Sequence, residues 1–531
     1  MRQRRRSCAA RRLSGIIRIR LQALRLHPHF AFIPLFYPAF FGPLFVSPFA
    51  MTPELLLEQL QHIVGAEHAR NDGDLSAWEQ DWRQLAQGRA LAVVSPANTE
   101  QVAAVVQACA AAKKAGLGVS IVPQGGNTGL VLGSTPDDSG MQVVLSLRRM
   151  NSVRAIDRHN LSITVDAGCI LQNVQEAAAA QGLLFPLSLA AEGSCVIGGN
   201  LAANAGGTQV VRYGNTRELC LGLEVVTADG QIWHGLSGLR KNNTGYDLRH
   251  LMIGSEGTLG IITAATMKLY PQPAAVCCAW LAVDSLESAV GLLALAQQHL
   301  HSGLTGFETM ESDALRLVEK HMPHMRMPID VAAGQAFVLL EYSDDESEDR
   351  ARARLEGLLE AAFEAELLTD GAVAQSLEQA QRMWDIREHI TLAQAAEGLH
   401  LKHDISVPTS SIPAFVQRAK EALQQALPGA RVINFGHLGD GNLHFNVQAP
   451  EGADPRQFVD TCQRQAEAAI YDCVAAFDGS FSAEHGVGRL KRHDLARYKD
   501  PVALGMMRAI KTALDPLNLL NPHALLPDAA A

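Results

Sequence analysis

Two histidines, His437 and His444, flank a Gly-Asp-Gly turn at 439–441 in the stretch INFGHLGDGNLHFNV. Apolar runs lie on both sides of this turn, so residues 433–447 predict a β-hairpin that brings the two imidazoles together across its arms. Neighbouring imidazoles are natural ligands of Zn²⁺ or a similar transition metal. A histidine at such a spacing is more often a core or surface residue, so the spacing alone leaves both interpretations open.

A second stretch, FSAEHGVGRLKR at 481–492, supplies the adjacent residues Glu484 and His485 beside two glycines. Either side chain could be the third protein ligand that a catalytic metal site needs. A histidine also has a reference pKa of roughly 6.5, which suits a general base near neutral pH. The two stretches together supply the side chains that a metal site with a neighbouring proton-transfer group would need, but their spacing alone favours an ordinary structural role for the histidines.

Three glycine-rich segments must position these residues and any cofactor. They read PQGGNTGLVLG at 123–133, GSCVIGGNLAANAGG at 193–207 and KNNTGYDLRHLMIGSEGTLGIIT at 241–263. Glycines in such loops let backbone N–H groups approach a diphosphate closely. The first segment matches neither the Walker loop nor the GxGxxG dinucleotide fingerprint. Each segment alone could be a tight turn or a helix crossing.

In this order and spacing, the three segments resemble the FAD-binding domain of the vanillyl-alcohol oxidase / p-cresol methylhydroxylase superfamily. Within it they look most like the D-2-hydroxyglutarate dehydrogenase branch, whose neighbours are D-lactate dehydrogenases and the glycolate oxidase flavoprotein subunit. The resemblance runs from about residue 90 to the C-terminus. It implies an α+β fold with a two-subdomain FAD-binding domain, then an α+β substrate or cap domain and a C-terminal helical segment.

The resemblance also implies which residues bind FAD. The pyrophosphate would lie on the first segment, the flavin along the second, and the adenosine and ring side on the third. The residues concerned are, in that order, Pro123, Gly125, Gly126, Asn127, Thr128 and Gly129; Gly193, Ser194, Gly199, Asn200 and Asn204; and Glu256, Gly257 and Ile262. Loop 123–133 contains no histidine or cysteine, so we expect non-covalent FAD. Leu132 stands where relatives commonly have glycine and should change the far end of the loop slightly.

By the same resemblance, His437, His444 and Glu484 bind a divalent metal, for which zinc is favoured, and His485 is the general base. The substrate-binding residues implied are Arg387, Thr391, Lys402, Asn446 and His485. A metal bound by a substrate hydroxyl lowers its pKa, as zinc lowers that of water from about 16 to about 7. The flavin would accept the hydride from Cα. The implied reaction is oxidation of a D-2-hydroxy acid.

The choice of hydroxy acid depends on the cations. A five-carbon diacid needs a second cationic contact that lactate does not, and the pair Arg387 and Lys402 favours D-2-hydroxyglutarate. A D-lactate or glycolate dehydrogenase of the same fold is the near alternative. A catalytically silent flavin-binding subunit is the alternative of another class, and a hydrolytic metalloenzyme leaves the glycine-rich segments unexplained. No NAD fingerprint or iron–sulfur cysteine set is present, so electrons are expected to leave to a carrier flavoprotein or a quinone.

Local patterns predict the elements around these segments. Thr52 and Pro53 should begin a short helix at 53–65, and Asn98 is a cap candidate for the helix that follows a strand at 91–94. Ala-Asp-Gly at 228–230, between two apolar runs, predicts a hairpin. The domains expected are an N-terminal extension at 1–50, the FAD-binding domain at 51–272, the cap domain at 273–402 and a C-terminal segment at 403–531.

Composition excludes some partners. The net charge is −10, and the first fifty residues hold nine arginines and no acid, which leaves 36 basic against 55 acidic residues elsewhere. An acidic body argues against a nucleic-acid partner. The apolar stretch at 29–50 contains four prolines, so we expect a non-native or disordered extension there and no membrane association. A homodimer is a guess from the family.

The nine cysteines form no CxxC pair and their number is odd. This pattern is typical of reduced thiols, and it predicts a cytoplasmic protein.

Overall fold

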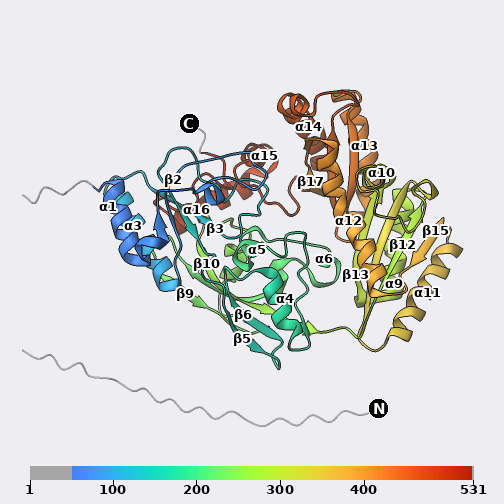
Figure 1. Ribbon diagram of the computed structural model, residues 1–531, viewed down its shortest axis with the longest axis horizontal. Helices are drawn as coiled ribbons and strands as arrows, with labels where there is room; N and C mark the ends of the chain where they lie inside the picture. The colour runs from blue at the N-terminus through green and yellow to red at the C-terminus, as the bar shows by residue number, and fades with distance from the viewer. Residues whose placement is uncertain (1–50, 529–531) are drawn as a thin grey trace, which may run out of the picture. The chain divides into compact units, whose positions relative to one another are not determined.

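The computed structural model describes residues 51–528 (Figure 1). The expected extension at 1–50 lies outside the described residues. The first described helix, α1 (Pro53–Val64), begins as expected, because Thr52 caps it by accepting the N–H of Leu55 and Pro53 occupies its first turn.

A small sheet of four strands opens the FAD-binding domain. Its order is β1 (Ala69–Arg70), β2 (Ala90–Val94), β4 (Gln142–Ser146) and β3 (Ser120–Gln124). The last three strands are parallel, and α3 (Thr99–Lys114) crosses from β2 to β3 after its cap at Asn98. Every residue of β2 and β4 is buried, which is why these strands read as short apolar runs without alternation.

A second sheet of five antiparallel strands shares its core with the first. Its order is β5 (Val153–Asp157), β6 (Ser162–Asp166), β10 (Ile261–Lys268), β8 (Cys220–Val226) and β9 (Ile232–Gly235). The hairpin predicted around 228–230 is confirmed as β8 and β9. The connecting helices are α4 (Leu171–Ala179), α5 (Ile197–Ala203), α6 (Val210–Tyr213), α7 (Thr216–Leu219) and α8 (Leu248–Met252). Two short strands, β7 (Leu183–Leu184) and β11 (Tyr270–Pro271), pair beside them.

The cap domain is built on one large antiparallel sheet. Its order is β15 (Asp370–Val373), β12 (Ala275–Val283), β14 (Ala336–Asp344), β13 (Leu304–Glu311), β18 (Arg431–His437), β19 (Asn442–Gln448) and β16 (His400–Leu401), with β17 (Asp404–Ser406) also paired to β19. Successive side chains of β12 enter two different cores, because neighbouring residues of a strand face opposite sides of a sheet. The expected boundary at 402/403 falls inside this sheet.

Helices cover both faces of the cap sheet. One core takes side chains from α9 (Leu286–Leu300), α11 (Glu348–Glu364), α13 (Ile412–Ala426) and α14 (Pro455–Ala476). The other takes side chains from α10 (Ser312–His321) and α12 (Leu377–Glu397). Single 3₁₀ turns lie at Ala66–His68, His301–Gly303, Val331–Ala333 and Thr409–Ser411.

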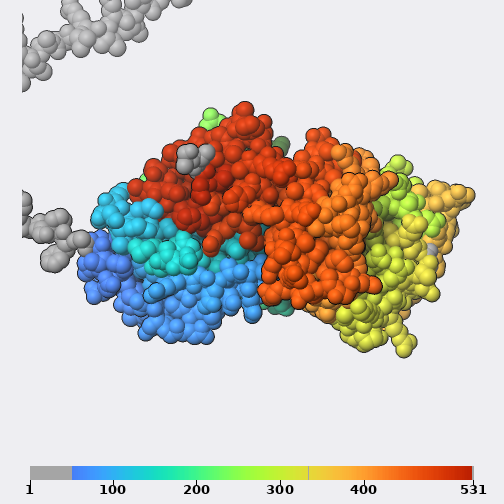
Figure 2. All heavy atoms as spheres, turned by 90° about the horizontal axis from the view of Figure 1, so that it is seen from above, coloured from blue at the N-terminus to red at the C-terminus, as the bar shows by residue number. Residues whose placement is uncertain are grey.

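The C-terminal residues return to the FAD-binding domain. After α15 (Arg492–Tyr498) and α16 (Pro501–Leu514), the chain runs beside β3, where Ile121 donates its N–H to Leu519 and accepts that of Asn521. Figure 2 shows this red segment lying against the cyan and blue N-terminal part. Leu525 of this segment also donates its N–H to Gly488, three residues after His485. Within residues 51–528 no helix is both long and apolar enough to cross a membrane.

Candidate active site

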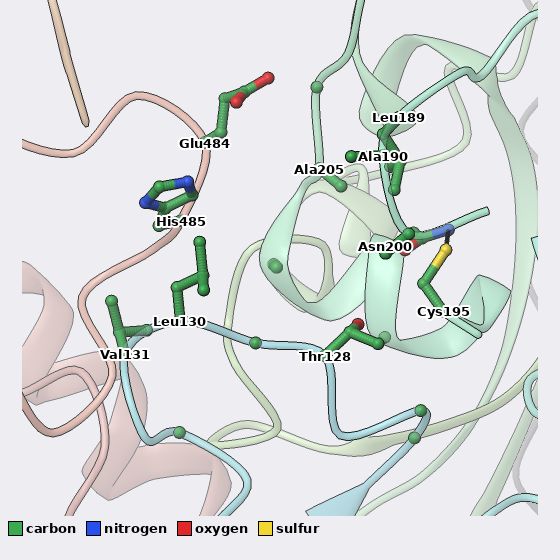
Figure 3. Close-up of a pocket in the computed structure, with 18 of the residues that line it drawn as sticks. Thr128, Leu130, Val131, Leu189, Ala190, Cys195, Asn200, Ala205, Glu484 and His485 are labelled. Carbon is green, nitrogen blue, oxygen red and sulfur yellow. Dashed lines mark hydrogen bonds between the residues drawn. The ribbon is translucent and has the colours of Figure 1, made fainter. Parts of the chain in front are cut away.

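A cavity of about 900 Å³ lies among the three glycine-rich segments, helix α12 and the hairpin of β18 and β19. Figure 3 shows Glu484 and His485 at the left, Asn200 of helix α5 at the right, and the loop from Val131 to Thr128 running below and between them. The cavity wall includes all the predicted site residues except Gly193 and Asn204. Asn204 instead ends α5 in a left-handed conformation, and its side chain accepts the N–H of Arg217.

The glycine loop fits a flat, phosphate-bearing cofactor. A Cβ added to Gly126 would lie 2.2 Å from the carbonyl oxygen of Ser194, so only glycine allows the first and second segments to pack this closely. Asn127 has a φ of 57°, and its amide donates to the carbonyl of Gln80 at 2.9 Å. Leu132, at the far end of this loop, takes a φ of 62°, a left-handed conformation that is strained for a leucine.

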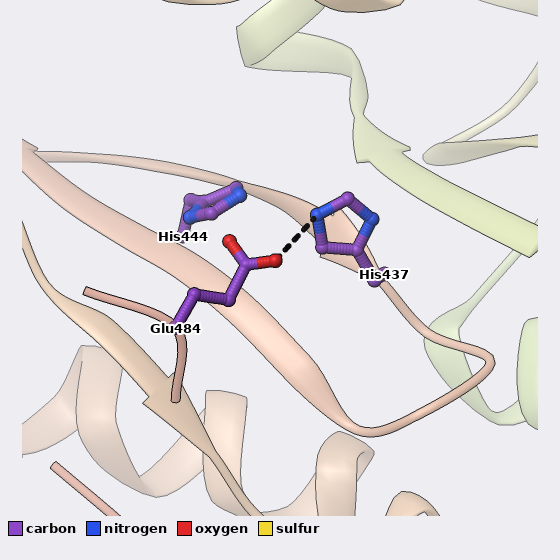
Figure 4. A group of neighbouring side chains, drawn as sticks. All are labelled: His437, His444 and Glu484. Carbon is purple, nitrogen blue, oxygen red and sulfur yellow. Dashed lines mark ion pairs between the residues drawn. The ribbon is translucent and has the colours of Figure 1, made fainter. Parts of the chain in front are cut away.

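The predicted hairpin brings the two histidines together. Phe435 pairs with His444 and His437 with Asn442, so the imidazoles lie two residues apart on one face of the hairpin, with ring centroids 5.5 Å apart. Glu484 completes the group, with its Oε1 3.7 Å from Nε2 of His437 (Figure 4). One ligand atom from each of the three residues lies within 4.8 Å of the others. A donor set of two imidazoles and one carboxylate fits a divalent transition metal.

Glu308, which the sequence analysis missed, orients the first histidine. This carboxylate on β13 is fully buried and accepts from Nδ1 of His437 at 2.7 Å, which leaves Nε2 directed at Glu484. A carboxylate behind a metal-binding imidazole fixes its tautomer in this way. Burial alone would lower the pKa of His437, but Glu308 and then Glu484 raise it to about 9. Without a metal, a protonated His437 is the cation between two carboxylates.

His444 and Glu484, the other two members of the group, have pKa values that are shifted in opposite directions. Burial, followed by the positive charge of His437, holds the pKa of His444 well below its usual value, so this imidazole is neutral and one of its ring nitrogens has a lone pair to offer a metal. Burial raises the pKa of Glu484 to about 7, against the attraction of His437. Both pKa shifts indicate that a cation bound between His444 and Glu484 would stabilise this group of side chains.

Asp404, also missed by the sequence analysis, holds the loop of the predicted base. Its Oδ2 accepts the backbone N–H groups of Glu484 at 3.0 Å and His485 at 2.9 Å, and lies 3.5 Å from Nδ1 of His485. A carboxylate at Nδ1 favours the tautomer in which Nε2 can accept a proton. Burial lowers the pKa of His485 to about 4, against the attraction of Asp404, so the imidazole is neutral.

The four other predicted substrate-binding residues all line the cavity, and they differ in how many of their polar atoms already bond to the protein. Arg387 lies 6% exposed and donates from Nε to Glu308 at 2.8 Å, so its charge is already compensated. Its Nη2 is 2.7 Å from the same carboxylate oxygen but is not aligned for a hydrogen bond, which leaves a donor for a ligand. Asn446 is committed to the protein, donating to Gln394 and accepting from the backbone of His403.

Thr391 lies one turn beyond Arg387 on α12 and reaches the same wall. Lys402 is half-buried at the wall and makes no hydrogen bond or ion pair within the described part of the chain. Of the two cations predicted to bind substrate, only Lys402 therefore has an uncompensated charge.

Glu256, expected beside the adenosine and flavin ring, also connects two parts of the site. Its carboxylate accepts the N–H groups of Val487 at 2.8 Å and Gly488 at 2.7 Å. It thereby holds the segment that follows Glu484 and His485 against the third glycine-rich segment. This side chain therefore links the group of His437, His444 and Glu484 to the glycine-rich segments.

Comparisons with known proteins agree with this geometry. Residues 90–235 match the family described as "FAD binding domain", and residues 272–525 match "FAD linked oxidases, C-terminal domain". The chain is similar to a D-2-hydroxyglutarate dehydrogenase of Xanthomonas citri pv. viticola, at 38% identity over 90% of this chain and 97% of the relative. It is 36% identical to a mitochondrial D-2-hydroxyglutarate dehydrogenase of Arabidopsis thaliana over 88% and 80% of the two chains.

Two further likenesses bear on substrate and fold. A putative mitochondrial D-lactate dehydrogenase of Schizosaccharomyces pombe is 34% identical over 87% of this chain and 86% of its own length. A solved structure of p-cresol methylhydroxylase with substrate bound superimposes with a TM-score of 0.69 at 15% identity, covering 88% of this chain and 96% of that one. This structural likeness shows that the chain has the same fold as p-cresol methylhydroxylase.

The predicted cytoplasmic location was wrong, because the Arabidopsis and fission-yeast relatives are named mitochondrial. The eight cysteines within the described residues are unpaired, a pattern that does not by itself identify a compartment.

Proposed function

The chain belongs to the FAD-linked oxidase family, together with the D-2-hydroxyglutarate dehydrogenases, and we infer that it is an FAD-dependent dehydrogenase that oxidises D-2-hydroxyglutarate to 2-oxoglutarate. The resemblance noted for the glycine-rich segments and the α+β fold class are confirmed. The observation that carries the proposal is one cavity that joins the cofactor loops to His437, His444, Glu484 and His485.

The chemistry divides between cofactors and protein. When bound, FAD accepts the hydride from Cα of the substrate. A divalent metal held by His437, His444 and Glu484 would polarise the substrate hydroxyl, and zinc fits this donor set. Glu308 keeps His437 in the tautomer that directs Nε2 toward Glu484.

His485 is proposed to take the hydroxyl proton at Nε2. Asp404 lies beside Nδ1 and fixes the backbone on both sides of the Glu484–His485 peptide, so the imidazole is held in one orientation. Its depressed pKa keeps it unprotonated near neutral pH, as a base must be at the start of the reaction. Arg387 and Thr391 are proposed to bind the carboxylate next to the hydroxyl, and Asn446 shapes the wall near them.

D-lactate is the second candidate substrate, because the fission-yeast relative is named a putative D-lactate dehydrogenase. Electrons are proposed to pass to an external carrier flavoprotein or quinone. The test is anaerobic reduction of the bound flavin, followed by loss of its visible absorbance, with D-2-hydroxyglutarate, D-lactate, D-malate and glycolate in turn. The proposal predicts the fastest reduction with D-2-hydroxyglutarate at sub-saturating concentration. A colourless purified protein, or faster reduction by D-lactate, contradicts it.

A further inference from the structure

A lysine outside the cavity anchors the loop that carries Glu484 and His485. Lys491 directly precedes α15, is half-buried and does not line the cavity. Its ammonium group donates to the carbonyl oxygen of Phe481 at 3.1 Å and to the hydroxyl oxygen of Ser482 at 3.2 Å. Both acceptors lie at the start of the loop, so the bonds of this side chain are made to the loop itself.

The hydroxyl group of Ser482 spans the loop. Its Oγ donates to the carbonyl oxygen of Gly486, so one side chain joins the residues on either side of the segment 483–485. An ammonium group has donors only, and a hydroxyl group has a single proton. Because Lys491 must donate to Ser482, the proton of Ser482 stays available for Gly486. Lys491 therefore fixes the direction of the hydrogen bond that closes the loop.

The far end of the loop is a tight turn at Gly486. Its φ of 78° is in the left-handed region that favours glycine, and a Cβ added there would lie 2.7 Å from Oε1 of Glu256. The same carboxylate accepts the N–H of Val487 at 2.8 Å. Glu256 therefore fixes the backbone just beyond the carbonyl group that Ser482 engages.

The near end of the loop is paired with β17. Ser480 exchanges two backbone hydrogen bonds with Ser406, at 2.8 and 2.9 Å, and the Asp404 side chain accepts the N–H groups of residues 484 and 485. None of these bonds links the two ends of the loop to each other. The bond from the Ser482 hydroxyl to Gly486 supplies that link.

The charges around Lys491 favour its protonated form. Burial lowers the pKa of Lys491, and the attraction of four carboxylates, those of Asp404, Asp494, Glu467 and Glu256, opposes this shift. Two of them, Asp404 and Glu256, also hold the loop through its backbone. A charged ammonium group makes stronger hydrogen bonds than a neutral donor, which suits an anchoring role.

We propose that Lys491, acting through the Ser482 hydroxyl, is a positioning residue for Glu484 and His485. The inference rests on the proposed function, which assigns the metal to Glu484 and the hydroxyl proton to His485. Both of these side chains line the cavity, and both start from the short segment that the Ser482 hydroxyl closes. The chain of bonds from Lys491 keeps that segment in one conformation, so that the two neighbouring side chains serve two different partners.

The test compares Lys491→Met and Ser482→Ala with Lys113→Met in the holoenzyme. Lys113 is the matched control, because it also donates to two protein oxygens, the carbonyls of Val119 and Asn518 at 3.0 Å, and none of these three residues lines the cavity. In anaerobic flavin reduction by D-2-hydroxyglutarate, both loop variants should lower the limiting rate by about 10- to 100-fold. The substrate concentration at half-maximal rate should change less, and Lys113→Met should keep the wild-type rate.

Two further variants check that the effect runs through the hydroxyl group. Ser482→Thr retains this group and should recover most of the rate. The double variant Lys491→Met/Ser482→Ala should lose little more than either single variant, because both substitutions break the same chain of bonds. Ser482→Ala removes one oxygen atom, so it decides the test if Lys491→Met does not fold.

Amide hydrogen exchange separates this inference from the proposed function, because it needs no turnover. Exchange at residues 483–486 should become about tenfold faster in Lys491→Met and Ser482→Ala, and should stay unchanged in Lys113→Met. If no hydroxy acid reduces the flavin, the proposed function fails, yet faster exchange confined to this loop still supports the anchoring role of Lys491. Wild-type exchange at 483–486, together with limiting rates equal to that of Lys113→Met, overturns the inference.

Discussion

The substitution Glu308→Gln tests whether this buried carboxylate organises the site. Glu308 has no solvent exposure and sits between His437 at 2.7 Å and Arg387 at 2.8 Å. The glutamine keeps the shape but removes the charge, which leaves a buried arginine without its counter-ion. Breaking a buried ion pair in this way costs about 3–5 kcal/mol.

The depressed pKa of Glu308 gives a similar magnitude for the stability that this charge contributes. Burial would raise this pKa, but His437 and Arg387 lower it from 4.5 to about 2. Because the folded-state pKa is depressed, the stabilisation is present above pH 4.5 and is lost as the pH falls toward 2. A shift of this size corresponds to about 3 kcal/mol. Glu308→Gln should therefore unfold at a lower urea concentration at pH 7, and the difference from wild type should shrink as the pH approaches 2.

Metal affinity gives the second readout. Loss of the carboxylate that orients a metal-binding imidazole is expected to weaken metal affinity by about 10- to 100-fold. Zinc affinity is measured by competition with a chromophoric chelator. The matched control is Glu341→Gln, since Glu341 is also a buried acid of the cap sheet, 9% exposed, but it accepts only from neutral groups, those of Thr305, Trp384, Gln209 and Cys278. If Glu308→Gln matches Glu341→Gln in both stability and zinc affinity, Glu308 has no organising role.

Three other predictions concern the same site. His485→Ala should slow flavin reduction by about 10²–10⁴-fold without loss of bound FAD, as followed by stopped-flow absorbance, and a loss below tenfold would exclude it as the base. Glu256→Gln should speed hydrogen exchange at residues 484–488 by roughly tenfold, because the side chain then offers one acceptor where two N–H groups need one each. Unchanged exchange would show that Glu256 does not hold this loop. The dissociation constant of glutarate, a diacid without the hydroxyl group, should rise as the pH increases through about 8, where Lys402 loses its proton. A pH-independent dissociation constant between pH 7 and 10 would contradict the role of Lys402.

Features encoded in short stretches of sequence were predictable. The hairpin that carries His437 and His444 follows from its Gly-Asp-Gly turn and apolar arms, and the start of α1 follows from Thr52 and Pro53. In both cases the deciding interactions lie within a few residues of each other, so propensity and turn chemistry suffice.

Features that depend on pairing between distant strands were not predictable. Glu308 reaches His437 only because β13 pairs with β18, 129 residues further along the chain. Asp404 reaches the 484–485 peptide from 80 residues away. A buried acid in an apolar strand is the sequence signal that each of them offers, but the signal does not name the partner.

The same limit applies to domain boundaries. Near residue 402 the sequence pattern changes from helical to strand-like, yet the strands that follow extend the cap sheet. Helical and strand periodicity report the local element and contain no information on which sheet a strand joins.

Anaerobic flavin reduction by D-2-hydroxyglutarate, before and after complete metal removal, tests whether a metal assists the reaction. With the flavin still bound, as its absorbance shows, the metal-free enzyme should be reduced at least about 10²-fold more slowly, and Zn²⁺ or a similar divalent ion should restore the rate. Reduction at the full rate in the metal-free holoenzyme would rule out metal assistance.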